Sequence, residues 1–161
     1  MINLKFFWQK KEYTCGPAAL RMVFDFFGKK LSEEKLTKKL KSNKKIGTSH
    51  QALIQEVMKE GFYCFVHENS SLNNLKDFIE KGFPIIIHYL DLSDNVEHYS
   101  VVIGFNKKEI ILNDSCNGKK FAVKISDFEK RWHSEKNNYQ KKWMMVISKN
   151  KFNLGRQYDP I

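Results

Sequence analysis

The sequence lacks several features that mark whole classes of protein. Its longest apolar runs, such as "FPIIIHYL", are far too short to cross a membrane. The start, "MINLKFFWQKK", has a brief apolar run and then lysines, without the small-residue cleavage site of a signal peptide. Repeats, low-complexity tracts and linkers are also missing. We expect a cytoplasmic protein with a single domain over residues 1–161, its core at about 7–148 and a surface tail at 149–161.

Cysteine is scarce. Cys15, Cys64 and Cys116 give an odd count at irregular spacing, without a CxxC pair. This excludes a disulfide framework and a structural zinc site. The chain also has no His/Cys/Asp set with metal-ligand spacing and no glycine-rich phosphate loop, so we expect no metal and no cofactor. A lone cysteine with a histidine elsewhere in the chain instead indicates a nucleophile.

Arginine is scarce too, although the net charge is +10. Bidentate recognition of phosphate or guanine prefers arginine, and the chain has only Arg21, Arg131 and Arg156. The lysines are scattered over every segment. We therefore expect a solvated lysine surface and no specific nucleic-acid partner, and the sequence leaves the oligomeric state open.

The patterns that are present divide the chain into a helical half and a sheet half. Helical periodicity and stop signals predict helices at 16–27, at 33–40 after a Ser32 cap, from a Thr48/Gln51 capping box to Gly61, and at 72–81. Short β-branched or aromatic runs predict strands at 62–66, 83–89, 98–105, 109–114, 120–125 and 143–148. One short helix, "SDFEKRW", capped by Ser126 or Asp127, interrupts the later strands. This segregation predicts an α+β fold with an antiparallel sheet.

Cys15 is the first residue with a candidate chemical role. It precedes Gly16 and Pro17, and proline is tolerated only in the first turn of a helix because it has no N–H to donate. Cys15 is thus predicted at a helix N-terminus. The unsatisfied N–H groups and the positive end of the helix dipole favour a thiolate there, which is the nucleophilic form. The alternative is a buried cysteine that acts as a small apolar residue.

His98 and Asp114 fit the base and the orienting group that such a nucleophile requires. His98 opens one predicted strand, and Asp114 closes the next. The tight turn "NKKE" joins the two strands, so the start of one and the end of the other meet at the same edge of the sheet. We therefore predict that Asp114 orients His98. The alternative for Asp114 is a turn-forming residue at a strand end.

Gln9 stands six residues before Cys15. Attack on a carbonyl builds negative charge on its oxygen, which a side-chain amide and a backbone N–H can stabilise. We predict Gln9 as the side-chain donor and the Cys15 amide as the backbone donor. The alternative is a surface glutamine.

The other cysteines and histidines are assigned structural positions. These are Cys64 in the core of a strand, His88 and Tyr89 at the end of an apolar strand, and His50 and His133 on helix surfaces. Cys116 follows Asp114 by two residues and is expected near the site, without an assigned role.

These residues together resemble the bacteriocin-processing cysteine peptidases, cysteine peptidase family 39, which have a papain-like fold. The shared pattern is Gln9, then "CGPA" from Cys15, "HYSVV" from His98, and Asp114 sixteen residues later. The likeness covers about residues 7–148. It includes "GTSHQALIQEVMKEGF", which is similar to the third helix and following strand of the family.

The resemblance implies a cysteine peptidase in which Cys15 is the nucleophile, His98 the general base and acid, Asp114 its orienter and Gln9 the oxyanion donor. Members of the family cut a leader peptide after a double glycine. They usually form the N-terminal cytosolic domain of an export transporter. The implied substrate is a peptide or protein, with a leader peptide as the family's own case, and an export transporter is the implied partner. Because no membrane segment or ATPase follows, the sequence favours a stand-alone relative.

Two departures from the family pattern bear on these expectations. The family often has an acidic residue where this chain has Thr14, and often a proline where it has Ser115. Two alternatives therefore stay open. One is a non-catalytic papain-like module that holds a peptide; the other is an acyl-transferase or deamidase that uses the same residues.

Overall fold

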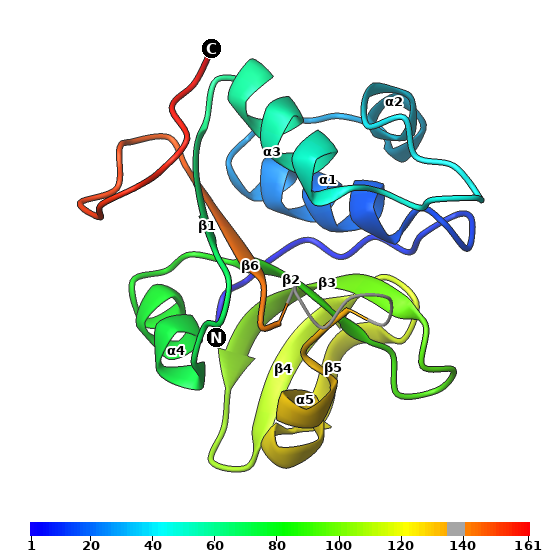
Figure 1. Cartoon of the computed structure of the whole chain (residues 1–161), viewed down its shortest axis with the longest axis vertical. Helices are drawn as coiled ribbons and strands as arrows, with labels where there is room; N and C mark the ends of the chain where they lie inside the picture. The colour runs from blue at the N-terminus through cyan, green and yellow to red at the C-terminus, as the bar shows by residue number, and fades with distance from the viewer. Residues whose placement is uncertain (135–140) are drawn as a thin grey trace.

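The structure, a computed structural model, describes residues 1–134 and 141–161 of the chain. Its helices are α1 (Cys15–Phe26), α2 (Glu33–Lys39), α3 (His50–Lys59), α4 (Leu72–Glu80) and α5 (Ile125–Arg131). Its strands are β1 (Tyr63–His67), β2 (Ile85–Leu90), β3 (Glu97–Phe105), β4 (Glu109–Asp114), β5 (Gly118–Lys124) and β6 (Met144–Ser148) (Figure 1). The predicted α+β class is confirmed.

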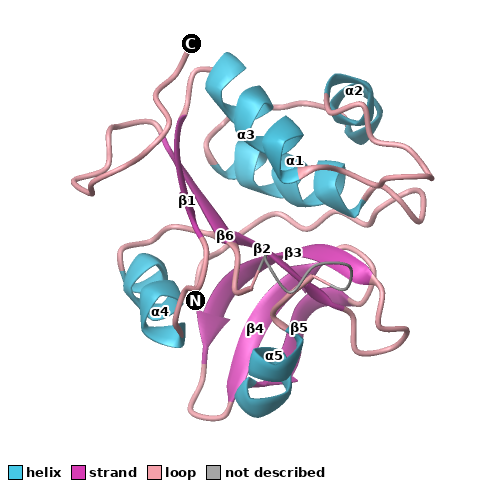
Figure 2. Cartoon of the chain, viewed as in Figure 1, coloured by secondary structure: helices cyan, strands magenta, loops and turns pink. Residues whose placement is uncertain are grey.

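The strands form one sheet in the order β1-β6-β2-β3-β4-β5, and every neighbouring pair is antiparallel. Helices α1, α2 and α3 gather on one side of the sheet, and α4 and α5 lie on the other (Figure 2). Two hydrophobic clusters fill the two interfaces. Because side chains alternate along a strand, Tyr99 and Val101 of β3 face the first cluster and Val102 faces the second. Burial on both faces explains the nearly continuous apolar runs of the central strands.

A β-bulge interrupts the pairing of β4 with β5 between Leu112 and Asp114. The extra residue lies in β5, where Lys119 and Lys120 together face Asn113 alone. The Asn113 side chain bonds across the bulge: Oδ1 accepts from the Lys120 N–H at 3.1 Å, and Nδ2 donates to the Leu4 carbonyl at 3.2 Å. Bulges often re-aim a side chain beside a functional site. This bulge lies directly beside Asp114, at the end of β4.

Three helices begin after a serine cap. Ser32, Ser49 and Ser71 each accept a hydrogen bond from the N–H three residues on. Ser32 is the predicted cap, but the capping box predicted at Thr48 is wrong. The Thr48 hydroxyl is 2.6 Å from that of Ser42, so it is not available to the helix, and α3 begins one residue later than predicted.

The predicted cap of α5 is wrong as well. The helix begins at Ile125, so Ser126 and Asp127 lie inside its first turn, and Lys124 in the cap position makes no side-chain cap bond. The Ile125 N–H instead donates to the Lys108 carbonyl at 2.9 Å. Strand β5 therefore runs into α5 without a turn.

The C-terminal tail lies along the free edge of β1. Tyr158 and Cys64 exchange two backbone hydrogen bonds, of 3.0 and 2.8 Å, and the Ile161 N–H donates to the Met58 carbonyl at 3.1 Å. These bonds cover part of an edge that would otherwise expose unpaired groups. That residues 1–161 form a single domain with its core at about 7–148 stays a prediction.

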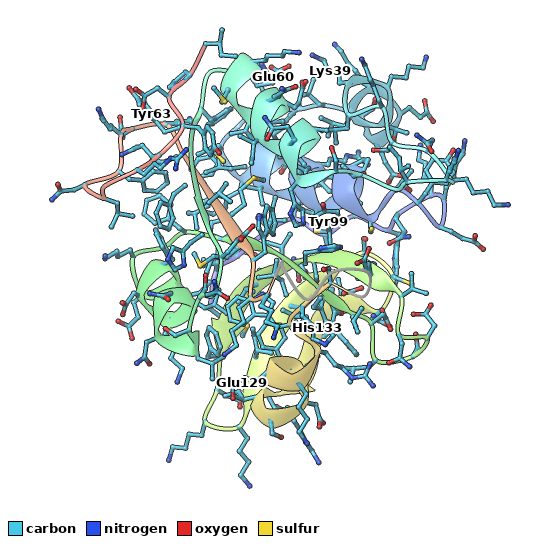
Figure 3. All side chains as sticks on the ribbon, in the orientation of Figure 1. Lys39, Glu60, Tyr63, Tyr99, Glu129 and His133 are labelled. Carbon is cyan, nitrogen blue, oxygen red and sulfur yellow. The ribbon has the colours of Figure 1, made fainter. Side chains whose placement is uncertain are left out.

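Ion pairs join α2 to α3 on the outer side of the helical layer. Lys39 contacts Glu56 at 3.0 Å and Glu60 at 2.9 Å, and Lys29 also pairs with Glu60 (Figure 3). In the part of the chain that the structure describes, no helix has the length and apolar character needed to span a membrane.

Candidate active site

Cys15 is the first residue of α1, as the Gly-Pro dipeptide predicts, and it is buried. Pro17 lies in the first turn, where its missing N–H costs nothing. Gly16 packs so closely on Thr48 that a Cβ there would lie 2.6 Å from the Thr48 hydroxyl oxygen. The Thr48 carbonyl in turn accepts a hydrogen bond from the Tyr99 hydroxyl at 2.9 Å. Figure 3 shows Tyr99 between the helices and the sheet. Thr48 thus contacts both Gly16 of α1 and Tyr99 of β3, and it connects the start of the helix to the sheet.

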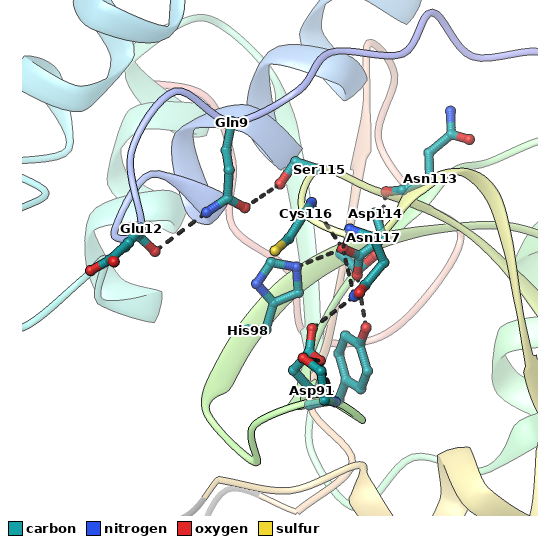
Figure 4. Close-up of polar contacts among 12 residues, drawn as sticks. Gln9, Glu12, Asp91, His98, Asn113, Asp114, Ser115, Cys116 and Asn117 are labelled. Atoms are coloured by element: carbon teal, nitrogen blue, oxygen red, sulfur yellow. Dashed lines mark hydrogen bonds and ion pairs between the residues drawn. The ribbon is translucent and has the colours of Figure 1, made fainter.

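His98 and Asp114 lie in contact at the same end of the sheet. His98 Nε2 is 2.9 Å from Asp114 Oδ1, and both side chains are buried (Figure 4). With Asp114 ionised, Nε2 carries the proton of this bond, since a carboxylate only accepts. The same imidazole lowers the pKa of the Cys15 thiol, and with Nε2 bonded to Asp114 the ring nitrogen left for the thiol is Nδ1. His98 therefore stands between Cys15 and Asp114.

Asp114 is held by more donors than His98 alone. Oδ2 accepts from the Tyr89 hydroxyl at 2.7 Å. Oδ1 also accepts from the backbone N–H groups of Cys116 and Asn117 at 3.0 and 2.9 Å, and from Asn117 Nδ2 at 3.2 Å. Such donors favour the charged carboxylate. Sequence reasoning gave no role to Asn117 and placed Tyr89 as merely structural. The role of Tyr89 follows from the antiparallel register of β2 against β3, because that register pairs Tyr89 with His98.

The charges of the site stabilise one another. Burial alone would raise the pKa of Cys15, but the hydrogen bond and charge of His98, with the N–H groups of Tyr99 and Gly16, bring that pKa below its ordinary value. Burial likewise disfavours the charged imidazole, yet the bonds to Asp114 and Cys15 raise the pKa of His98 well above 6.5. The same contacts lower the pKa of Asp114 to about 2, against the opposing effect of burial. The arrangement favours a thiolate beside an imidazolium.

Gln9 lies on the loop that leads to α1 and contacts the turn after Asp114. Its backbone N–H donates to the Ser115 carbonyl at 3.1 Å, and its Oε1 accepts from the Ser115 hydroxyl at 2.8 Å. Its Nε2 donates to the Lys11 carbonyl at 2.9 Å and, at 3.3 Å, to that of Glu12. The side-chain amide is thus ordered, and both of its N–H groups point to carbonyls of its own loop.

A cleft of about 620 Å³ opens over these residues. It is lined by the Gln9–Glu12 loop on one side, by Asp91, Asp94, Val96, Glu97 and His98 on the other, and by Cys116. Cys116 is exposed, and its position beside the site agrees with the prediction. Of Cys15, His98 and Asp114, His98 is the residue that lines the cleft.

Asp91, His98 and Asp114 are a group of metal-type ligands within the described residues, with donor atoms no more than 4.8 Å apart. Each has other partners. Asp91 accepts from the backbone and hydroxyl of Ser93 and from Asn117, and Asp114 Oδ1 accepts from His98. Hydrogen bonds therefore account for the cluster.

His88 is buried in β2, as predicted, but the positions predicted for His50 and His133 need correction. His50 is not simply on a helix surface: its ring stacks on Trp143 at 4.0 Å between centroids, and its Nε2 is 3.0 Å from Nδ1 of His88. Burial, together with the charge of His88, lowers the pKa of His50 to about 3. His133 lies just after α5, where its backbone forms an isolated antiparallel β-bridge with Lys141. Cys64 is confirmed as a core strand residue, and burial raises its pKa to about 12.

Comparison with known proteins identifies the family of the chain. The Peptidase_C39 like family matches residues 1–140. The lactococcin-G-processing and transport ATP-binding protein LagD of Lactococcus lactis subsp. lactis is 26% identical over 129 residues, which are 80% of this chain and 18% of that protein. The chain thus spans less than a fifth of this relative's length.

Solved structures show the same fold. The peptidase domain of Streptococcus ComA, a bi-functional ABC transporter involved in quorum sensing, matches with a TM-score of 0.75 at 23% identity, over 92% of this chain and 100% of that one. A C39-like peptidase from Bacillus anthracis gives 0.74 at 16% identity, over 93% and 96%. A double glycine motif protease from an AMS/PCAT transporter, solved with a leader peptide, gives 0.71 at 19% identity, over 90% and 91%. The chain belongs to the Peptidase_C39 like family and has its papain-like α+β fold.

Proposed function

We propose that this protein is a cysteine peptidase in which Cys15 is the nucleophile, His98 the general base and acid, and Asp114 the group that orients His98. The observation that carries the proposal is the position of one imidazole between a buried thiol at a helix start and a buried carboxylate. Nucleophile, base and orienter in series are the arrangement that nucleophilic catalysis requires.

In the first half of the reaction, the Cys15 thiolate attacks the carbonyl carbon of the scissile peptide bond and a C–S bond forms. The carbonyl oxygen takes the negative charge. Two donors receive it: Nε2 of Gln9, and the N–H of Cys15, which belongs to the first turn of α1 and has no acceptor within the helix. His98 Nδ1 then gives its proton to the departing amine, the C–N bond breaks, and a thioester remains.

In the second half, water attacks the thioester carbon while His98 Nδ1 takes one of its protons. The C–S bond breaks, the thiolate is regenerated and the acid product leaves. Asp114 stays ionised throughout, because its donors hold its pKa at about 2. Its charge keeps His98 oriented and stabilises the imidazolium at both stages.

The proposed substrate is a leader peptide with a double glycine before the cut, and the proposed partner is an export transporter. LagD is named as a lactococcin-G-processing and transport protein, and one structural relative is a double glycine motif protease seen with a leader peptide. Processing before export would place the reaction in the cytoplasm.

Mass spectrometry of peptide libraries tests the proposal, with wild type and Cys15→Ala compared side by side. We expect wild type to cut a subset of peptides, with double-glycine peptides prominent, and Cys15→Ala to cut none. Cys64→Ala is the matched control, because it removes another buried thiol without touching His98. Cleavage that survives Cys15→Ala would refute the nucleophile.

The same spectra distinguish the alternatives. Bound but uncut peptide would indicate a non-catalytic module. Products lengthened by an added amine, in a library supplemented with glycinamide, would indicate an acyl-transferase.

A further inference from the structure

Ser115 is the residue that fixes the side chain of Gln9. It follows Asp114 directly and is 1% exposed. Its carbonyl accepts from the Gln9 backbone N–H at 3.1 Å, and its hydroxyl donates to Gln9 Oε1 at 2.8 Å. Two residues separated by 106 positions are thus joined through both backbone and side chain.

The direction of the Gln9 amide follows from its partners. The carbonyls of Lys11 and Glu12 can only accept hydrogen bonds, so the NH2 group must face them. The oxygen then faces Ser115, and the hydroxyl must donate to it (Figure 4). A flipped amide would set Oε1 against two carbonyl oxygens with no proton between them. Ser115 and the two loop carbonyls therefore favour the same orientation of the Gln9 amide: Ser115 binds its oxygen, and the carbonyls bind its NH2 group.

Gln9 lines the cleft, and its NH2 group is bonded to two carbonyls of the loop that forms one wall of it. Of its two bonds, the one to Glu12 is the longer, at 3.3 Å against 2.9 Å for Lys11. A negatively charged oxygen accepts a stronger hydrogen bond than a neutral carbonyl does. An oxyanion can therefore take the second N–H from the Glu12 carbonyl while Oε1 stays bound to Ser115.

The same turn also holds the carboxylate that orients His98. Residues 116 and 117 donate their backbone N–H groups to Asp114 Oδ1, while Ser115 between them and Asp114 contacts Gln9. A single turn after β4 thus connects the two halves of the site, the base and the oxyanion donor.

We propose that Ser115 is a positioning residue: its hydroxyl holds the Gln9 amide in the orientation that receives the oxyanion. The inference rests on the proposed peptidase function. Ser115 itself touches neither substrate nor reacting atoms, and its effect passes through Gln9.

A double-mutant cycle tests this role on a peptide that wild type cuts. Loss of an oxyanion donor in Gln9→Ala is expected to lower kcat by about 10²–10³-fold. Ser115→Ala is expected to lower kcat by roughly tenfold with KM nearly unchanged, since Gln9 remains but is less well oriented. Ser115→Thr retains the hydroxyl and is expected to restore kcat. In the Gln9→Ala background, Ser115→Ala should have no further effect.

Ser100→Ala is the matched control. Ser100 is also 1% exposed, and its hydroxyl also donates to a carbonyl, that of Asn113 at 3.2 Å, without contacting Gln9. If Ser115→Ala lowers kcat by the same factor with and without Gln9, the role of Ser115 is only structural and the proposal is overturned. A threonine variant as slow as the alanine variant would overturn the proposal as well.

A second readout separates this inference from the proposed function. If wild type cuts no peptide and Cys15 shows no enhanced alkylation, the peptidase proposal fails. The side-chain amide signals of Gln9 in ¹H–¹⁵N NMR spectra still report on Ser115. We expect them to shift in Ser115→Ala and to stay in place in Ser115→Thr and Ser100→Ala. Unchanged signals in Ser115→Ala would overturn the positioning role whatever the activity.

Discussion

His98 Nε2 and Asp114 Oδ1 lie 2.9 Å apart although they belong to different strands, and this contact links the protonation of the two groups. Asp114 stays ionised because its pKa is lowered to about 2, and its charge raises the pKa of His98. The imidazolium then lowers the pKa of Cys15. A carboxylate that does not touch the thiol thus influences its reactivity through the histidine.

The first prediction concerns the order in which the cysteines react. With iodoacetamide at pH 6, we expect Cys15 to be alkylated at least tenfold faster than Cys116, and Cys64 to be slowest. An ordinary thiol with a pKa of about 8.5 is only roughly 0.3% thiolate at that pH. The pKa of Cys15 is lowered. Partial desolvation and the negative charges of Asp114 and Asp91 raise the pKa of Cys116, and burial brings that of Cys64 to about 12. Peptide mapping by mass spectrometry measures the three rates.

Cys116 is the informative comparison, because it is exposed and Cys15 is buried. If accessibility rather than thiolate content controlled the rate, Cys116 would react first. That order would contradict the thiolate–imidazolium pair.

The second prediction concerns the alkaline limb of the pH–rate profile. The pKa of His98 is raised, so the imidazolium persists at low pH and is lost as pH rises through that pKa. Asp114→Asn removes a charge that raises it, and we expect the alkaline limb to move to lower pH and kcat to fall. Profiles of kcat/KM against pH measure the shift. Asp77→Asn, on the exposed side of α4, should leave the limb in place; an unmoved limb in Asp114→Asn would contradict the assigned role.

The third prediction concerns Tyr89, whose hydroxyl donates to Asp114 Oδ2 at 2.7 Å. Tyr89→Phe removes one donor from a buried carboxylate, and hydrogen bonds to charged groups contribute about 1.5–3 kcal/mol. We expect the free energy of unfolding at pH 7 to fall by about that amount, measured by urea denaturation. Tyr63→Phe, on a partly exposed strand position, should cost less than about 0.5 kcal/mol.

The acid limb of stability gives an independent check on Tyr89. The folded-state pKa of Asp114 is depressed to about 2, so its contribution is present above its ordinary pKa and is lost as pH falls towards 2. Without the tyrosine donor the folded-state pKa rises, and we expect acid unfolding to begin at higher pH in Tyr89→Phe. An unshifted acid transition would mean that the hydroxyl does not stabilise the ionised carboxylate.

Local patterns were enough to predict the parts of the site that depend on local structure. Gly16 and Pro17 mark a helix start by sterics alone, and Cys15 is found there. The contact of His98 with Asp114 follows from two strands joined by a tight turn. These inferences need only one helix start and one pair of strands that are consecutive in the chain.

Features that depend on distant parts of the chain could not be predicted in this way. The Thr48 hydroxyl pairs with Ser42 instead of capping α3. Tyr89 looks like one more apolar strand residue until the register of β2 sets it beside His98 and Asp114. The hydrogen bond from the Ser115 hydroxyl to Gln9 joins residues 106 positions apart. In each case the sequence suggests a local role for a side chain, whereas in the structure its polar group binds a partner elsewhere in the chain.

The last prediction concerns Gly16, whose absent side chain makes room for Thr48. A Cβ at position 16 would lie 2.6 Å from Oγ1 and 2.7 Å from Cβ of Thr48. Gly16→Ala is therefore expected to displace the start of α1 from the loop before α3, at a cost of about 1–3 kcal/mol, the range typical of overpacking. Urea denaturation measures this cost.

Thr48→Ala distinguishes the source of the clash in Gly16→Ala. It removes Oγ1 and Cγ2 but keeps the Cβ that would lie 2.7 Å away, so we expect it to restore little of the lost stability. The alkylation rate of Cys15 should fall in Gly16→Ala as well, because the Gly16 N–H is one of the groups that lower its pKa. If the double variant regained full stability, flexible side-chain atoms rather than the backbone approach would be the constraint, and the need for glycine beside the nucleophile would be refuted.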